Sequence, residues 1–241
     1  MSAGAAPGRA SVPHEAVDDF APFGIRAFTT TRAAGSFSTT SDEPVREVMA
    51  RWDALREMLS DAGPRLATAR QVHGARVVVH GAGWEGWLRG GAADGHVSVE
   101  RGTAMAVSVA DCVPAFLAHP SGATAVLHSG WRGTAGRIVE QGVLALGHRG
   151  IPARELHLHL GPAICGKCYE VSPEVYGQVT GRSTDRPTPV DLRLVIADHA
   201  RAAGVGHVTV SDHCTRCDND RYYSHRAGDA GRQLGVIVAE S

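Results

Sequence analysis

Residues 111–133, DCVPAFLAHPSGATAVLHSGWRG, contain the pattern that decides the fold class. One apolar run precedes this stretch at 104–110, and a second lies inside it at 123–127. Short apolar runs bounded by turn residues are typical of buried strands, and the Pro-Ser-Gly break before the second run is a turn signal. We therefore expect two neighbouring strands, the first followed by Cys112 and the second by His128.

The residues at the ends of these two strands predict a functional site. They bring a thiol and an imidazole to one edge of a sheet, where α/β proteins commonly build sites. A second imidazole, His73, lies upstream of a strand-like run at 76–80. Two His and one Cys suit zinc, and three protein ligands leave a fourth position for water, whose pKa falls to about 7. We expect His73, Cys112 and His128 to bind a metal, with ordinary core positions as the alternative.

Asp111 adjoins the proposed thiol ligand. A carboxylate at this position is suited to accept a hydrogen bond from a ligating imidazole or to carry protons. Its structural alternative is the cap of a turn. We expect Asp111 to take part in catalysis together with Cys112 and His128.

Charge and hydropathy exclude several classes of partner. The 24 basic and 25 acidic residues nearly balance, so neither nucleic acid nor a membrane surface is indicated. No apolar run approaches the roughly 20 residues of a membrane span, and the N-terminus lacks a signal-peptide pattern. We expect a cytoplasmic protein with one domain at 19–241, behind a loose N-terminal tail at 1–18 that is rich in Ala, Gly, Pro and Ser.

Hydrophobic periodicity predicts strands that alternate irregularly with helices. Strands are expected at 25–30, 77–80, 103–109, 156–160, 208–211 and 236–239, and helices at 43–62, 134–146 and 189–203. Several strands are separated only by turns, which favours mixed sheets over a regular doubly wound sheet. The expected fold is α/β (α+β), a single domain of mixed β-sheets covered by helices. No Gly-rich dinucleotide motif or P-loop is present, so the usual nucleotide cofactors are not indicated.

The chain has five cysteines, and four of them form two C-x-x-C pairs. An odd count without a secretory signal favours reduced thiols, metal binding or catalysis over a disulfide framework. Cys165 with Cys168 and Cys214 with Cys217 together offer four thiolates to a structural zinc. The long separation of the pairs is unlike that of a small zinc module, so a redox pair or inert thiols are alternatives.

A series of motifs resembles the bacterial laccase-domain family, long labelled polyphenol oxidase and also described as purine nucleoside phosphorylase and adenosine deaminase. The motifs are QVHG (71–74), ADG (93–95), ADC-P (110–114), H-x-GWRG (128–133), GP-x-I…CYEV (161–171), CT (214–215), YYSHR (222–226) and GR (231–232). The resemblance spans about residues 25–240. It implies a single-domain α/β fold of mixed sheets, with a zinc held by His73, Cys112 and His128.

The resemblance also implies a reaction. This is phosphorolysis of purine nucleosides, including methylthioadenosine, together with hydrolytic deamination of adenosine. The implied partners are purine nucleosides and phosphate, bound by a monomer or a small homo-oligomer. Deamination requires an activated water, which Asp111 or Gln71 would orient.

Phosphorolysis requires a clamp for phosphate, and the planar fork of Arg binds phosphate through two hydrogen bonds. Candidates are Arg32, Arg132, Arg226 and Arg232. We expect Arg32 and Arg226 to bind phosphate, because they adjoin matched motifs.

Two other functions remain open. Two imidazoles and a thiolate also hold copper, so oxidation of polyphenols is one alternative. Multicopper chemistry needs many paired His ligands, and only His157-x-His159 forms such a pair. The other alternative is a cysteine hydrolase, with Cys112 as nucleophile and His128 as base.

Overall fold

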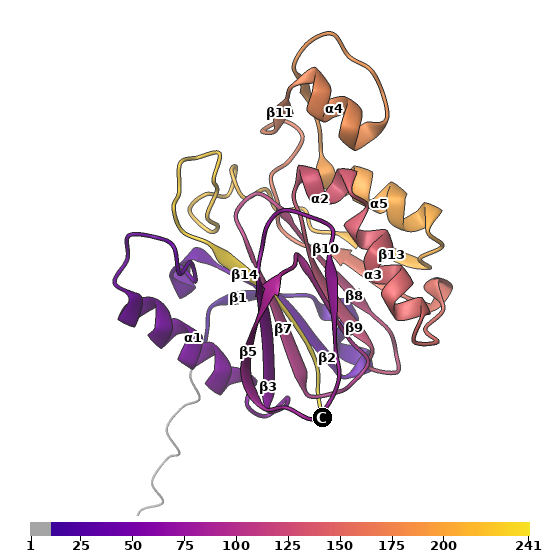
Figure 1. The fold of residues 1–241 in the computed structure, drawn as a ribbon. Helices are drawn as coiled ribbons and strands as arrows, with labels where there is room; N and C mark the ends of the chain where they lie inside the picture. The colour runs from indigo at the N-terminus through magenta and orange to yellow at the C-terminus, as the bar shows by residue number, and fades with distance from the viewer. Residues whose placement is uncertain (1–10) are drawn as a thin grey trace, which may run out of the picture.

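Two six-stranded mixed sheets form the centre of the molecule (Figure 1). The structure is a computed structural model, and it describes residues 11–241. The first sheet has the strand order β1-β2-β14-β7-β3-β5. Its strands are β1 (His14–Ala16), β2 (Ile25–Thr30), β3 (Arg65–Arg70), β5 (Gly86–Ala92), β7 (Thr103–Val109) and β14 (Gln233–Ala239).

The second sheet has the strand order β13-β10-β8-β9-β6-β4. Its strands are β4 (Val77–His80), β6 (Gly95–Ser98), β8 (Val113–Ala118), β9 (Thr124–Ser129), β10 (His157–Leu160) and β13 (His207–Val210). Every residue of β8 and β9 is buried, which is why both strands read as continuous apolar runs. A short pair, β11 (Glu170–Val171) and β12 (Thr188–Pro189), lies outside both sheets.

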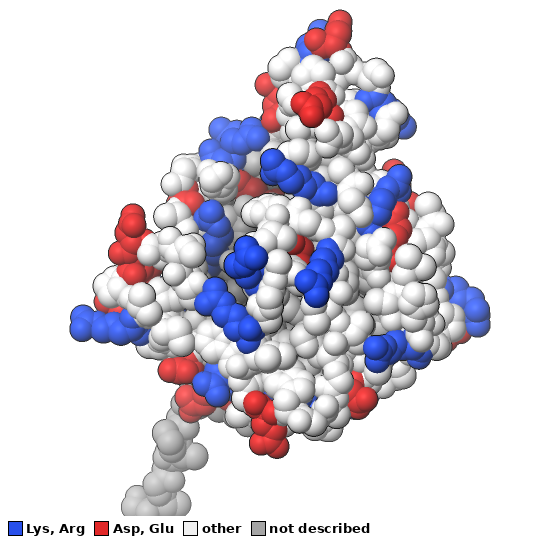
Figure 2. All heavy atoms as spheres, in the orientation of Figure 1, with Lys and Arg blue, Asp and Glu red and all other residues white. Residues whose placement is uncertain are grey.

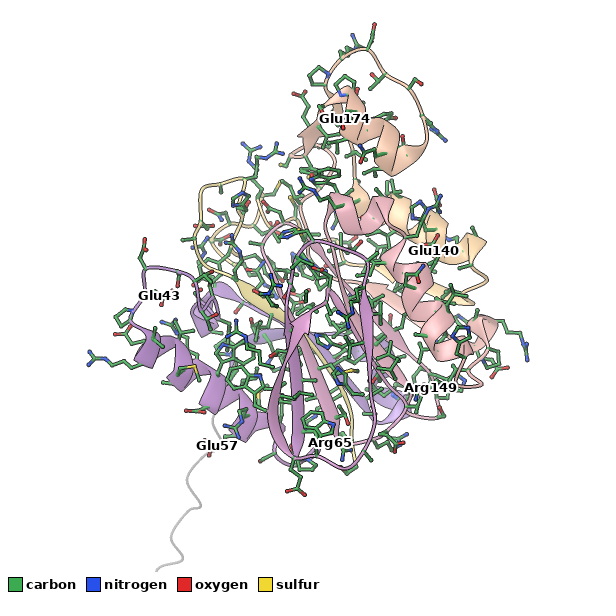
Figure 3. The ribbon with its side chains drawn as sticks, viewed as in Figure 1. Glu43, Glu57, Arg65, Glu140, Arg149 and Glu174 are labelled. Carbon is green, nitrogen blue, oxygen red and sulfur yellow. The ribbon has the colours of Figure 1, made fainter. Side chains whose placement is uncertain are left out.

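The described helices lie outside the two sheets, and three of them cover the outer faces. They are α1 (Val45–Leu59), α2 (Trp131–Ala135), α3 (Ile138–Gly147), α4 (Pro173–Thr180) and α5 (Leu192–Ala202), with short 3₁₀ helices η1 (Asp18–Phe23), η2 (Arg32–Ala34) and η3 (Ala153–Glu155). α1 packs on the first sheet and α3 and α5 pack on the second (Figure 1). Helix α4, which carries Glu174, stands apart from both sheets (Figure 3).

The core between the sheets is apolar. Phe116 and Val126 of the second sheet pack there against Met105, Val107 and Ile237 of the first. This four-layer arrangement confirms the expected single-domain α/β fold of mixed sheets covered by helices. Among the described residues, no helix combines the length and the apolar character that a bilayer span requires.

The two strands expected around the central stretch are not neighbours in one sheet. β7 belongs to the first sheet and β9 to the second, because 113–118 forms an additional strand, β8, that pairs with β9. Pro114 makes this run look unlike a strand, but it stands at the second position of β8, where a missing N–H is tolerated. The expectation of adjacent strands was therefore wrong, although both runs are strands.

Other differences follow local sequence features. The expected tail is too long, because β1 pairs with β2 and both Val12 and Val17 are buried; residues 1–10 lie outside the described part of the chain. The helix expected at 134–146 is divided into α2 and α3 at Arg137, whose φ is 61°. Elements absent from the predicted ranges include β3, β5, β6, β8 and α4, of which β5 is rich in Gly and β8 contains Pro114.

Candidate metal centre and adjoining cavity

The three predicted ligands meet in the structure. The ligand atoms of His73, Cys112 and His128 all lie within 4.8 Å of one another. His73 follows β3, Cys112 precedes β8, and His128 belongs to β9, so the ligands come from three segments of both sheets. The imidazole centroids of His73 and His128 are 4.8 Å apart. Two His and one Cys in this arrangement match the donor set of an open zinc site.

The backbone beside the cluster adopts unusual conformations and approaches the thiol closely. His73 and Asp111 have φ values of 60° and 77°, in the left-handed region that costs non-glycine residues about 1–2 kcal/mol. Such strain persists only where surrounding contacts hold it. A glycine is required at position 130, because a Cβ on Gly130 would lie 2.8 Å from the Sγ of Cys112.

Asp94 holds two of the three ligands, and the sequence analysis assigned it no role. Its Oδ1 accepts a hydrogen bond from the Nδ1 of His128 at 2.9 Å and from the backbone N–H of His73 at 2.8 Å. Its Oδ2 accepts from the N–H groups of Val72 and Gly74, at 3.1 and 2.8 Å. Burial raises the pKa of Asp94, but His128 and these N–H groups outweigh it and leave the pKa lowered.

The ionised Asp94 therefore orients the site. With its Nδ1 engaged by Asp94, the His128 ring leaves Nε2 for the cluster, an arrangement common among metal-binding imidazoles. The signal that points to Asp94 is the ADG motif at 93–95, which the sequence analysis matched without giving its carboxylate a function.

The protein favours the thiolate form of Cys112. Burial alone would raise the pKa of the thiol, but His128 and His73 lower it to about 6. Burial would lower the pKa of His128, but Cys112 and Asp94 raise it to about 9. Both shifts favour a thiolate beside an imidazolium, and the thiolate is the form that binds metals and attacks electrophiles.

Asp111 is buried beside Cys112 but is not among the residues that line the adjoining cavity. Its Oδ1 accepts a hydrogen bond from the hydroxyl of Thr215 at 2.7 Å, and its Oδ2 accepts one from the backbone N–H of Arg226 at 2.7 Å. These contacts favour a role in holding two C-terminal loops against Cys112. Its predicted acid–base role stays a prediction.

A cavity of about 410 Å³ opens onto the metal cluster, a size suited to a small ligand. Its walls combine aromatic rings, hydroxyl groups and basic side chains. They include Phe37, Ser38, Thr39, Thr40, Trp52, Arg70, Gln71, His73, Trp87, Arg89, Cys112, His128, His225 and Arg232. In Figure 2, basic side chains gather near the centre of the viewed face, where the surface is hollowed.

Gln71, predicted to bind substrate and to orient the attacking water, lies in the cavity wall, and its role stays a prediction. Its side-chain amide, however, makes two hydrogen bonds to the backbone of Ser108. The Nε2 group donates to the carbonyl at 2.8 Å, and Oε1 accepts from the N–H at 2.7 Å. These bonds fix the loop after β3 against β7.

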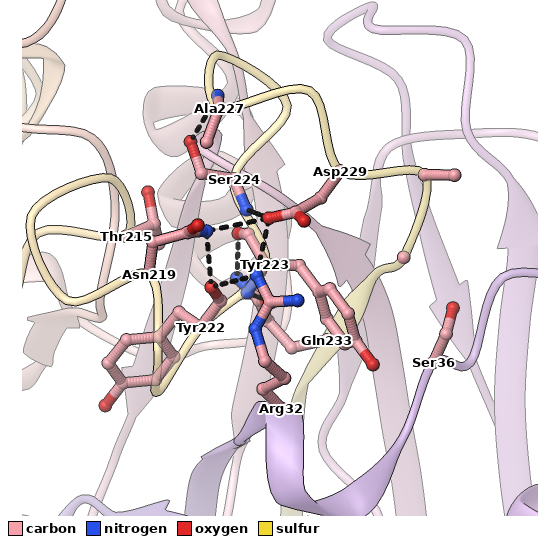
Figure 4. Close-up of polar contacts among 12 residues, drawn as sticks. Arg32, Ser36, Thr215, Asn219, Tyr222, Tyr223, Ser224, Ala227, Asp229 and Gln233 are labelled. Carbon is pink, nitrogen blue, oxygen red and sulfur yellow. Dashed lines mark hydrogen bonds and ion pairs between the residues drawn. The ribbon is translucent and has the colours of Figure 1, made fainter.

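The two arginines chosen from the sequence do not line the cavity. The Nη2 of Arg32 lies 2.6 Å from Oδ2 of Asp229 and 3.1 Å from the carbonyl of Tyr222 (Figure 4). Arg226 lies over the ring of Tyr169, with the guanidinium carbon 5.0 Å from the centroid. Arg70 and Arg89, which were not among the candidates, do line the cavity; Arg70 directly precedes the QVHG motif, whereas no motif marks Arg89.

Comparison with known proteins identifies the family of this chain. The family described as "Multi-copper polyphenol oxidoreductase laccase" matches residues 28–240. The chain belongs to this family. A purine nucleoside phosphorylase of Deinococcus radiodurans is 35% identical over 230 residues, which cover 86% of this chain and 87% of that protein.

Two further similarities cover most of the chain. The adenosine deaminase RL5 of an unknown prokaryotic organism is 30% identical over 88% of this chain and 90% of that protein. The crystal structure of YlmD from Geobacillus stearothermophilus superposes with a TM-score of 0.82 at 27% identity, over 91% of this chain and 94% of that one. These comparisons confirm the family that the motifs indicated.

Proposed function

We propose that this chain is a zinc-dependent purine nucleoside phosphorylase that acts on inosine, adenosine and methylthioadenosine and also deaminates adenosine. The observation that carries the proposal is the position of the two-His, one-Cys cluster in the wall of a cavity that also contains basic and aromatic side chains. The relatives named purine nucleoside phosphorylase and adenosine deaminase support the same chemistry.

The aromatic wall is suited to a purine base. Trp52 and Trp87 stack with ring centroids 4.6 Å apart. Their indole N–H groups donate to the carbonyl of Phe37 and the hydroxyl of Thr68, at 3.2 and 2.9 Å, so both rings are held in place. Trp52 is buried beneath Trp87, which is partly exposed, and a fixed aromatic ring favours binding of a flat heterocycle at little entropic cost.

The basic wall is suited to phosphate. Arg70, Arg89 and Arg232 line the cavity, together with His225. Within residues 11–241, the Arg89 guanidinium makes one hydrogen bond, to the hydroxyl of Thr39 at 3.3 Å, so it keeps donors for an anion. We therefore place the phosphate clamp among these three arginines instead of at Arg32 and Arg226.

His73, Cys112 and His128 would hold the metal, and their donor set fits zinc. When bound, zinc polarises oxygen ligands and makes water nucleophilic near neutral pH. The chain itself supplies the rest: Asp94 fixes the His128 ring, and Asp111 holds the C-terminal loops beside Cys112. Proton transfer by Asp111 is part of the proposal for deamination.

The proposal predicts that inosine releases its base only with inorganic phosphate and forms ribose 1-phosphate. Arg89→Ala and Arg232→Ala should each raise the KM for phosphate about 10–100-fold, the loss expected for one charged hydrogen bond. The KM for inosine should change less. Steady-state kinetics with Arg201→Ala, an exposed arginine on α5, provide the matched control. Equal rates of base release with and without phosphate would contradict phosphorolysis.

A cysteine hydrolase is the second candidate, and one arrangement favours it. The carboxylate of Asp94 orients the imidazole of His128, which in turn contacts the thiol of Cys112. Cysteine-dependent hydrolases arrange the same groups in this order. Removal of metal separates the two functions. A phosphorylase should lose activity with a chelator and regain it with zinc, whereas a hydrolase should keep its activity until Cys112 is alkylated.

Copper oxidation of phenols is supported by the family description alone. Within residues 11–241, the candidate metal clusters contain only two imidazoles, both at the site described above. His157 instead stacks on His207 at 4.2 Å between centroids, and the Nδ1 of His159 lies 2.9 Å from the hydroxyl of Thr209. The paired His ligands that multicopper chemistry uses are therefore not assembled here.

A further inference from the structure

The four remaining cysteines come together although 45 residues separate the two C-x-x-C pairs in the chain. Cys165 and Cys168 follow β10, whereas Cys214 and Cys217 follow β13. β10 and β13 are parallel neighbours, so the segments that follow them leave the same edge of the sheet. A parallel bridge between Ala163 and Cys214 continues this pairing into the two loops.

The arrangement of the sulfur atoms matches a tetrahedral metal site. All four Sγ atoms lie within 4.8 Å of one another, and those of Cys168 and Cys217 are 3.5 Å apart. A zinc–sulfur distance of about 2.3 Å implies sulfur–sulfur separations of about 3.8 Å in a tetrahedron. The observed separation is close to this value and far longer than the ~2.05 Å of a disulfide.

Hydrogen bonds favour the thiolate form of the most buried cysteine. The Sγ of Cys214 accepts from the backbone N–H groups of Cys165 and Cys217, at 3.2 and 3.5 Å. The residue is only 5% exposed. Hydrogen bonds to a charged group stabilise the charged form, so these two N–H groups stabilise the thiolate of Cys214, which is the form that binds a cation.

Positive charge also lies beside the cluster. Four thiolates around a divalent ion leave two negative charges in excess, which nearby cations offset. Each C-x-x-C loop contains one basic residue, Lys167 in the first and Arg216 in the second. The Nη1 of Arg216 donates to the carbonyl of Cys168 at 3.4 Å, which joins the two loops.

We propose that Cys165, Cys168, Cys214 and Cys217 bind a structural zinc ion, separate from the metal at His73, Cys112 and His128. Four protein ligands leave no open position, so this site does not perform chemistry. Its place in the fold suggests what it stabilises. Thr215, the neighbour of Cys214, donates to Asp111, which precedes Cys112. The zinc would thus brace the loop that holds Asp111 beside the reactive thiol.

Metal analysis of the full chain tests the proposal without depending on activity. Wild type, purified under reducing conditions, should contain about two zinc ions per chain. In the double variant His73→Ala/Cys112→Ser, two of the three ligands of the first site are removed, and one zinc should remain. Because this variant contains only the four cysteines of the second site, cobalt substitution should produce the intense sulfur-to-metal absorption of a tetrathiolate.

The outcomes separate the two sites. Adding Cys217→Ser to the double variant should abolish the remaining zinc and the cobalt absorption. A double variant that is folded but contains no zinc would overturn the proposal, as would a native disulfide between Cys168 and Cys217 detected by mass after alkylation. Neither result concerns the phosphorylase, which is tested by metal at the first site and by phosphate dependence.

Discussion

At the scale of single residues, one buried carboxylate organises the candidate metal centre. Asp94 is fully buried and accepts hydrogen bonds from His128 and from three consecutive backbone N–H groups at residues 72–74. It therefore fixes both the imidazole of His128 and the loop that carries His73. A residue with this many contacts affects metal binding without being a ligand.

Asp94→Asn should weaken zinc binding at the first site about 10–100-fold, the usual effect of losing the carboxylate partner of a ligating imidazole. The amide keeps the shape but loses the negative charge, and its nitrogen cannot accept hydrogen bonds. Competition with a chromogenic chelator measures the affinity. The exposed Asp185→Asn is the control. Unchanged affinity in Asp94→Asn would show that the carboxylate only holds the loop.

At the scale of elements, β4 and β6 share a buried pair of histidines. The Nε2 of His80 lies 2.9 Å from the Nδ1 of His96, and the two rings stack with centroids 5.2 Å apart. One of these nitrogens has to accept the hydrogen bond, so both rings cannot be protonated together. Burial lowers the pKa of His80, and burial together with His80 lowers the pKa of His96 to about 3.

This pair predicts a loss of stability in acid. The folded pKa of His96 lies below its unfolded value of about 6.5, so its contribution is present above that pH and is lost as the pH falls toward the folded pKa. At pH 5 the free energy of unfolding should be lower by about 2 kcal/mol than at pH 7.5. Urea unfolding at both pH values measures the difference.

The comparison needs two variants. His96→Leu should remove most of this pH dependence, whereas His148→Leu, at an exposed position, should keep it. An equal dependence on pH in wild type and His96→Leu would assign the acid sensitivity to other groups.

At the scale of the whole molecule, the C-terminal segment returns to the N-terminal part of the chain. Arg32 forms an ion pair with Asp229 at 2.6 Å and donates to the carbonyl of Tyr222. Its guanidinium also lies over the ring of Tyr223, 4.4 Å from the centroid. Asp229 in turn accepts a hydrogen bond from the side-chain amide of Asn219. Arg32 and Asp229 therefore connect the C-terminal segment to the N-terminal part of the chain (Figure 4).

Arg32→Ala should therefore lower the free energy of unfolding by about 1–2 kcal/mol, because several hydrogen bonds are lost at a partly buried site. Thermal unfolding measures the change. Arg26→Ala is the matched control, since Arg26 pairs with Asp61 and Glu240 in a more exposed setting and should cost less than about 1 kcal/mol. A large rise in the KM for phosphate with unchanged stability would instead support Arg32 as the phosphate clamp.

The sequence by itself determined the fold class and the three residues of the candidate metal centre. Apolar periodicity is a local property, so strands such as β2 and β7 and helix α1 could be located without a structure. His73, Cys112 and His128 were found because each follows or precedes a strand-like run and belongs to a matched motif. Segments with weak periodicity, such as the Gly-rich β5 and the Pro-containing β8, were missed for the same reason.

Only the tertiary structure decided which polar side chains meet. Cys112 approaches His128 across the β8–β9 pairing, and Asp94 reaches the imidazole of His128 and the backbone N–H of His73 from a third segment. In the folded chain, Arg32 forms an ion pair with Asp229, whereas Arg89 lines the cavity. These contacts depend on sheet order and register, which join residues distant in the chain, and periodicity within one segment carries no information about them.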